Sequence, residues 1–220
     1  MSYDPSDAAY DQFVDELYEE FRDSALEDDQ LYNRVVEDFK ESRLRDYYID
    51  HPLVAKAAQD ALAEAQELRG GHPRTALVLA VIAAEVCLRD ALLAPILHGS
   101  FHTGSTADLV VKLVVAGKDE KLINALVRVL AAHTRIDLRQ FGRSGSGKAL
   151  WEEMREIQVK RNRIVHQAER ASVEEADAAI EVAKATLYQV FGGTISNLGL
   201  HLHENVRVCA LPKCPEAGAP

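Results

Sequence analysis

The residues best suited to chemistry lie in the run Arg-Asn-Arg-Ile-Val-His, which ends at His166. Arg161 cannot lose its charge, Asn162 offers a polar amide, and the imidazole of His166 belongs to the class that titrates near neutral pH. Asn162 and His166 are four residues apart, so on a helix they stand one above the other. Arg161 and His166 are separated by about 140° on an ideal helix, so the long arginine side chain must reach for both to meet one group. A cation, an amide and an imidazole around one small volume suit a phosphodiester.

A predicted helix over residues 149–169 positions this run, because its apolar residues recur at helical spacing. Arg161 falls on the apolar face of that helix, where a guanidinium needs an anionic partner. Glu85 is the expected partner, since it interrupts the longest apolar stretch of the chain. We expect Arg89 and Asp90, one turn further on, to complete the network. A buried Glu–Arg pair can also be purely structural.

The charge of the chain is unevenly distributed. The 220 residues are 47% hydrophobic with seven prolines, which indicates a globular, mostly helical protein with a net charge of −10. Residues 1–50 contain 16 acidic and 5 basic side chains, whereas the rest contains 19 acidic and 20 basic. Residues 135–170 carry 9 basic and 5 acidic side chains, so the basic region coincides with the helix that holds Arg161. The acidic total argues against sequence-blind coating of nucleic acid but not against a focused site.

The pattern predicts an all-α protein in three parts: an acidic helical N-terminal arm at 1–50, a helical bundle at 51–192, and a weakly structured tail at 193–220. The arm is either a solvated helical hairpin or a segment that shields a basic groove or binds a partner. Glycine pairs, prolines and capping residues set the boundaries of the expected bundle helices. These helices are 52–69, 73–97, 105–117, 119–133, 149–169 and 172–191.

Nothing in the sequence indicates a membrane partner. The chain does not open with a basic, apolar leader, and its most apolar stretch, residues 76–84, is far below the roughly 20 residues that a membrane crossing needs. Three cysteines give no disulfide framework and suit a reducing compartment. We therefore expect a soluble, cytoplasmic protein.

Two further patterns are weaker. Gly142 to Lys148 has the spacing of a phosphate-binding loop, but Ala149 replaces the hydroxyl that would bind magnesium, which favours a flexible flap. The C-terminal region contains four residues of metal-binding type at a spacing that matches none of the recurrent zinc patterns. These residues are His201, His203, Cys209 and Cys214. We favour a chance cluster as the interpretation, and metal binding remains an open alternative.

An apolar helix with an internal acid (AVIAAEVCLRDALL), a later helix ending in RNRIVH, and a capped closing helix resemble the HEPN domains. These all-α bundles occur in RNases of toxin–antitoxin, abortive-infection and CRISPR systems and in non-catalytic nucleotide-binding relatives. The resemblance covers residues 52–191. The family pattern is an arginine, four to six residues and a histidine, often with a polar residue after the arginine, where Asn162 stands. Arg45 to His51 and Arg128 to His133 share the spacing but lack the asparagine.

The resemblance implies a HEPN-type bundle and metal-independent RNA cleavage, in which the 2′-hydroxyl attacks its own phosphate and leaves a 2′,3′-cyclic end. It implies proton transfer by His166, phosphate binding by Arg161, orientation by Asn162 and positioning by Glu85, without cofactor or metal. The cations expected to bind RNA are Lys148, Lys160, Arg163 and Arg89.

One chain supplies a single histidine in this run, whereas the reaction needs an acid and a base, so we expect a two-fold homodimer with a composite site. A cognate inhibitor or partner protein would suit such an enzyme. The alternatives are a non-catalytic module that binds a nucleotide or protein, and a helical interaction protein in which Arg161 and Glu85 form a structural pair.

Overall fold

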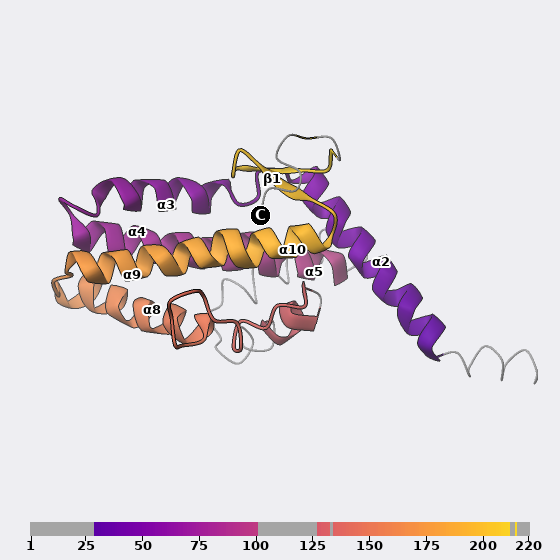
Figure 1. Cartoon of the computed structure of the whole chain (residues 1–220), viewed down its shortest axis with the longest axis horizontal. Helices are drawn as coiled ribbons and strands as arrows, with labels where there is room; N and C mark the ends of the chain where they lie inside the picture. The colour runs from indigo at the N-terminus through magenta and orange to yellow at the C-terminus, as the bar shows by residue number, and fades with distance from the viewer. Residues whose placement is uncertain (1–28, 101–126, 133, 212–213, 215–220) are drawn as a thin grey trace, which may run out of the picture. The chain divides into compact units, whose positions relative to one another are not determined.

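The computed structural model describes residues 29–100, 127–132, 134–211 and 214, and these are mostly helical (Figure 1). The chain divides into two compact units, residues 1–40 and 41–220, and the second contains the bundle. The helical elements are α2 (Asp29–Asp50), α3 (Lys56–Leu68), α4 (Pro73–Val86), the π-helical η1 (Cys87–Leu93), α5 (Ala94–Ser100), α8 (Leu150–Gln167), α9 (Val173–Lys184), the π-helical η2 (Ala185–Phe191) and α10 (Gly192–Asn197). The prediction of an all-α fold is confirmed for the described residues, apart from one small hairpin.

Helix α4 is the centre of the bundle and packs against α3, α8 and α9 (Figure 1). Pro73 stands in its first turn, where the missing N–H is not needed by the helix. Four of its alanines, Ala76, Ala80, Ala83 and Ala84, are buried, and these small side chains let neighbouring helices approach closely. The predicted position of the apolar helix at the core is therefore correct.

The long helix from Pro73 does not continue as a regular α-helix. It widens into the π-helical η1, and α9 is followed in the same way by the π-helical η2. The two π-helical segments contact each other. Cys87 Sγ lies 3.8 Å from the carbonyl oxygen of Thr186 across this contact, and the Tyr48 hydroxyl donates to the carbonyl of Ala91 at 2.7 Å. Burial raises the pKa of both Tyr48 and Cys87, which keeps these groups neutral donors inside the core.

The turn between α8 and α9 is well defined by its capping residues. Ala168 adopts the left-handed conformation (φ 53°) just after α8, as is common at helix C-termini. Ser172 then accepts a hydrogen bond from the backbone N–H of Glu175, whose carboxylate accepts one from the Ser172 N–H. This capping box, predicted from the sequence, is confirmed and starts α9.

The expected helix end at Gly192-Gly193 is wrong. The chain continues from η2 into α10, and a Cβ added at Gly193 would lie 3.0 Å from Ile136 Cδ1, so glycine serves close packing there. Beyond α10, β1 (His201–His203) and β2 (Arg207–Cys209) form an antiparallel hairpin. Val208 is buried and its N–H donates to the Pro52 carbonyl at 2.8 Å. The first half of the expected tail is therefore structured.

Two expected boundaries differ from the observed packing. Leu44 and Tyr48, which the sequence pattern assigns to the arm, are buried in the core of the second unit, because the last turns of α2 pack there. Helix α3 begins at Lys56, after a turn, and not at Pro52. The first predicted helix of the arm and the predicted helix 105–117 lie outside the described residues, as does most of 119–133.

Candidate functional site

The acid and the arginine singled out from the sequence lie together between α4 and α8. Arg161 Nη2 is 3.7 Å from Glu85 Oε2, and the other oxygen of Glu85 accepts a hydrogen bond from Gln158 Nε2 at 2.9 Å. Gln158 was not identified from the sequence, although it stands one turn before Arg161 on the same face. The side chains of Arg161 and Glu85 are 30% and 33% exposed, so the pair is half-buried and not buried as the apolar surroundings in the sequence indicate. The pair lies at the solvent edge of the α4–α8 interface.

Asn162 also contacts the guanidinium. Arg161 Nη1 donates to Asn162 Oδ1 at 3.0 Å, so the amide oxygen fixes the arginine of its own helix. The Nε of Arg161 is buried and has no hydrogen-bond partner among the described residues. A buried donor without a partner is costly, and an anion that drew the guanidinium outward would relieve this cost. The arginine is thus held by two neighbours but retains donor capacity.

His166 stands on a different face of α8. It is exposed, as are Asn162 and Arg163, while Arg161 turns towards α4. His166 and Arg163 make no side-chain hydrogen bond or ion pair within the described part of the chain. Since α8 continues through Gln167, Arg161 and His166 keep the separation of about 140° expected of an ideal helix. One chain therefore brings Glu85, Arg161 and Asn162 together and leaves the imidazole facing outward.

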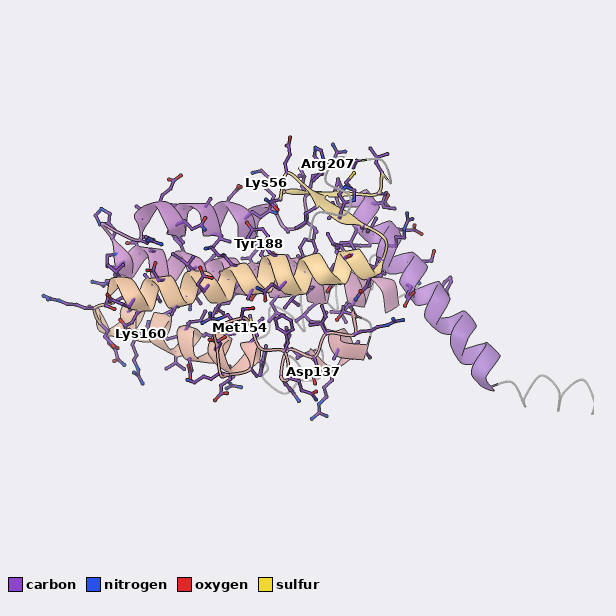
Figure 2. The ribbon with its side chains drawn as sticks, viewed as in Figure 1. Lys56, Asp137, Met154, Lys160, Tyr188 and Arg207 are labelled. Atoms are coloured by element: carbon purple, nitrogen blue, oxygen red, sulfur yellow. The ribbon has the colours of Figure 1, made fainter. Side chains whose placement is uncertain are left out.

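Three of the four cations expected to bind RNA are paired with carboxylates. Lys160 Nζ lies 2.8 Å from Glu169 and 2.6 Å from Glu175, at the end of the bundle where α8 meets α9 (Figure 2). Hydrogen bonding to these carboxylates raises the pKa of Lys160, and the ammonium lowers the pKa of Glu175. Lys148 pairs with Glu156.

Arg89 pairs with its neighbour Asp90 at 2.6 Å, and neither residue contacts the Arg161 guanidinium. Hydrogen bonding to Asp90 raises the pKa of Arg89, and the charge of Glu85 raises it further, so Arg89 and Asp90 meet the expected network through charge and not through direct contact with Arg161. They lie in η1, whose wider turn changes the direction in which its side chains point relative to α4. Arg163 is the remaining expected cation, and among the described residues its guanidinium has no carboxylate partner.

The glycine-rich loop before α8, where the sequence predicts a flexible flap, contacts that helix through its side chains. Arg143 donates to both oxygens of Glu153, at 3.0 and 2.9 Å, and Ser146 Oγ donates to Oε1 at 2.9 Å. The side chains of Arg143 and Glu153 are only 18% and 10% exposed. Glu153 follows the buried Leu150 by one turn, and this spacing was a signal in the sequence for a buried acid. The loop fixes the start of α8.

The competing Arg-to-His spacings have different surroundings. His51 is exposed and stacks on Tyr47 with ring centroids 4.2 Å apart, beyond the end of α2. His133 lies outside the described residues.

In the described part of the chain, no helix is both long enough and apolar enough to cross a membrane.

Comparison of the chain with protein-family models, with curated proteins and with solved structures finds no match. The likeness to the HEPN domains therefore rests on the order of its helices and on the RNRIVH run.

Proposed function

We propose that the chain is a metal-independent endoribonuclease of the HEPN type, whose site is completed by a second copy. One observation carries this proposal: His166, Asn162 and Arg163 are exposed on α8 together with two apolar side chains of the same helix. Val159 is 50% exposed and Val165 is 54% exposed. Contiguous apolar surface rimmed by polar groups marks sites that bind a partner, and we propose that the two valines belong to such a surface once a second copy of α8 packs on them.

Two copies of α8 packed through these valines would bring two imidazoles to one two-fold axis. In the proposed reaction, one His166 takes the proton of the 2′-hydroxyl as its oxygen attacks the phosphorus. The other gives a proton to the departing 5′-oxygen, so that the products are a 2′,3′-cyclic phosphate and a free 5′-hydroxyl. Arg163 and Arg161 supply positive charge for the oxygens of the phosphorane.

Glu85 and Asn162 have a positioning role in this proposal. Glu85 holds Arg161 from α4 and is itself held by Gln158, so the guanidinium has a defined starting place. Residues that fix the geometry of a catalytic group raise the rate by reducing the motion needed to reach the transition state. In the binding-only alternative, the same contacts would hold the arginine for a nucleotide phosphate.

The test is incubation of the purified chain with labelled RNA in the presence of a chelator. Wild type is expected to give cyclic-phosphate ends, whereas His166→Ala and Arg161→Met are expected to give none. The matched controls are His51→Ala and Arg45→Met, which alter the same spacing at the end of α2 and should retain full activity. Equal cleavage by His166→Ala and wild type would refute the assignment.

The dimer has its own test. Val165→Glu places a charge on the apolar outer face of α8 and should lower both dimer content in light scattering and RNA cleavage. Leu53→Glu is the control, because Leu53 is similarly exposed (51%) at the start of the bundle. A wild-type monomer at micromolar concentration that still cleaves RNA would contradict the composite site.

One observation favours the binding module as the second candidate. A catalytic base is usually oriented by a further group, but His166 has no such partner among the described residues. If the second copy also provides none, nucleotide binding without cleavage is the expected behaviour. A nucleotide-dependent rise in the melting temperature, lost in Arg161→Met and without any RNA cleavage, would establish it.

A further inference from the structure

The C-terminal hairpin gathers three side chains with metal-binding atoms. His201 and Cys209 are paired across β1 and β2, and the N–H of Cys214 donates to the Leu211 carbonyl at 3.1 Å. The ligand atoms of His201, Cys209 and Cys214 all lie within 4.8 Å of one another. Three side chains whose sequence spacing matches no recurrent metal-binding pattern thus place their ligand atoms close together.

The surroundings of these atoms also suit a metal site. His201 Nε2 is buried and has no hydrogen-bond partner among the described residues. The N–H of Leu211 points at Cys209 Sγ at 3.4 Å, which is the kind of donation that stabilises a thiolate. His203 lies two residues after His201, on the same face of β1, and its Nδ1 is 3.0 Å from Cys214 Sγ.

We propose that His201, Cys209 and Cys214 bind a Zn²⁺ ion, with His203 next to them on the thiolate of Cys214. Zinc prefers tetrahedral sites of cysteine sulfur and histidine nitrogen, and the ligands of such a site are about 3.5–3.8 Å apart, from bond lengths of about 2.3 Å to sulfur and about 2.0 Å to nitrogen. Since the donor atoms are already within 4.8 Å, a shift of about 1 Å or less closes the site.

The ion would join Cys214 to the hairpin, which is itself attached to the start of the bundle. The hairpin is attached there by the Val208 N–H on the Pro52 carbonyl and by the Gln59 amide on the Asn205 carbonyl. Arg207 of this hairpin lies far along the bundle from Lys160 (Figure 2). The site is separate from the proposed ribonuclease site, so a chelator should loosen the hairpin without stopping RNA cleavage.

The experiment uses the full chain, reduced and stripped of metal, titrated with Zn²⁺ against a chromogenic chelator and with Co²⁺ by visible absorption. We expect one ion per chain, and the intense absorption of tetrahedral Co²⁺ with thiolate ligands. Cys209→Ser, Cys214→Ser and His201→Ala should each weaken Zn²⁺ binding by more than about 100-fold. His203→Ala should weaken it by about 10- to 100-fold, as is usual for a group that supports a ligand.

The matched controls are Cys87→Ala and His72→Ala, which remove a cysteine and a histidine elsewhere and should leave the stoichiometry at one. Helical circular dichroism checks that each variant is folded, because the hairpin contributes almost none of that signal. Two results would overturn the proposal. One is the absence of Zn²⁺ binding at micromolar concentration in the folded, reduced wild type, and the other is binding that survives the loss of both Cys209 and Cys214.

Discussion

The contact between Glu85 and Arg161 can be measured by a double-mutant cycle. At 3.7 Å, two unit charges attract each other by about 1 kcal/mol in water and by about 4.5 kcal/mol at an effective dielectric constant of 20. About a third of each side chain is exposed, so the lower end applies, and we expect a coupling energy of about 1–1.5 kcal/mol. Glu85→Gln is the suitable change, because it removes the charge and keeps an oxygen that can accept from Gln158.

The assay is urea unfolding followed by circular dichroism for wild type, Glu85→Gln, Arg161→Met and the double variant. The coupling should shrink in high salt, because exposed charges are screened. If the pair also positions Arg161 for catalysis, Glu85→Gln should slow RNA cleavage about 10-fold, which corresponds to about 1.4 kcal/mol in the barrier. Additive effects on stability, to within about 0.3 kcal/mol, would show that the two charges do not interact and would refute the positioning role.

Three further predictions concern stability. Glu153→Ala should lower the free energy of unfolding by about 3–5 kcal/mol, because it leaves the largely buried Arg143 unpaired. The control is Glu152→Ala, which removes an exposed carboxylate and should change the free energy of unfolding by less than about 0.5 kcal/mol. Equal losses for the two variants in urea unfolding would contradict a stabilising contact between Arg143 and Glu153. Lys160 lowers the pKa of Glu175, so this carboxylate stabilises the fold above its unfolded pKa and loses that effect as the pH falls through its folded pKa. Melting temperatures measured from pH 7 to pH 3 should therefore fall less steeply in Glu175→Gln, and parallel curves would exclude the effect. Tyr48→Phe should cost about 1–3 kcal/mol in urea unfolding, because a buried carbonyl loses its donor, and an unchanged midpoint would show that this carbonyl finds another.

Periodicity and capping residues predicted much of the fold. The apolar stripe placed α4 at the core, and the Ser172 and Glu175 pair located the start of α9. The same helical spacing led from Arg161 to its partner Glu85, because a charge on an apolar face needs compensation. These inferences depend on the spacing of residues along one helix, which the sequence gives directly.

Other features depend on contacts that the sequence does not reveal. The glycines after η2 resembled a helix end, but the packing of Ile136 against Gly193 decides the conformation there. The tether of Arg143 to Glu153 forms only when the loop folds back on α8, so a composition rich in glycine suggested mobility instead. The fold brings Cys214 and Cys209 next to His201, which no recurrent spacing would indicate.

The widened turn of η1 has a consequence for insertions and deletions. A π-helical segment accommodates one more residue than the same length of α-helix, so removing one residue from 87–93 would rewind it. Because the wide turn absorbs the extra residue, the helical turns before and after it would keep their directions, so Glu85 would still face α8 and Ile96 would stay in the core. The same deletion inside the regular part of α4 would instead rotate the two sides of the helix by about 100°. The segment 87–93 is therefore the part of this long helix where the loss of one residue should be tolerated best.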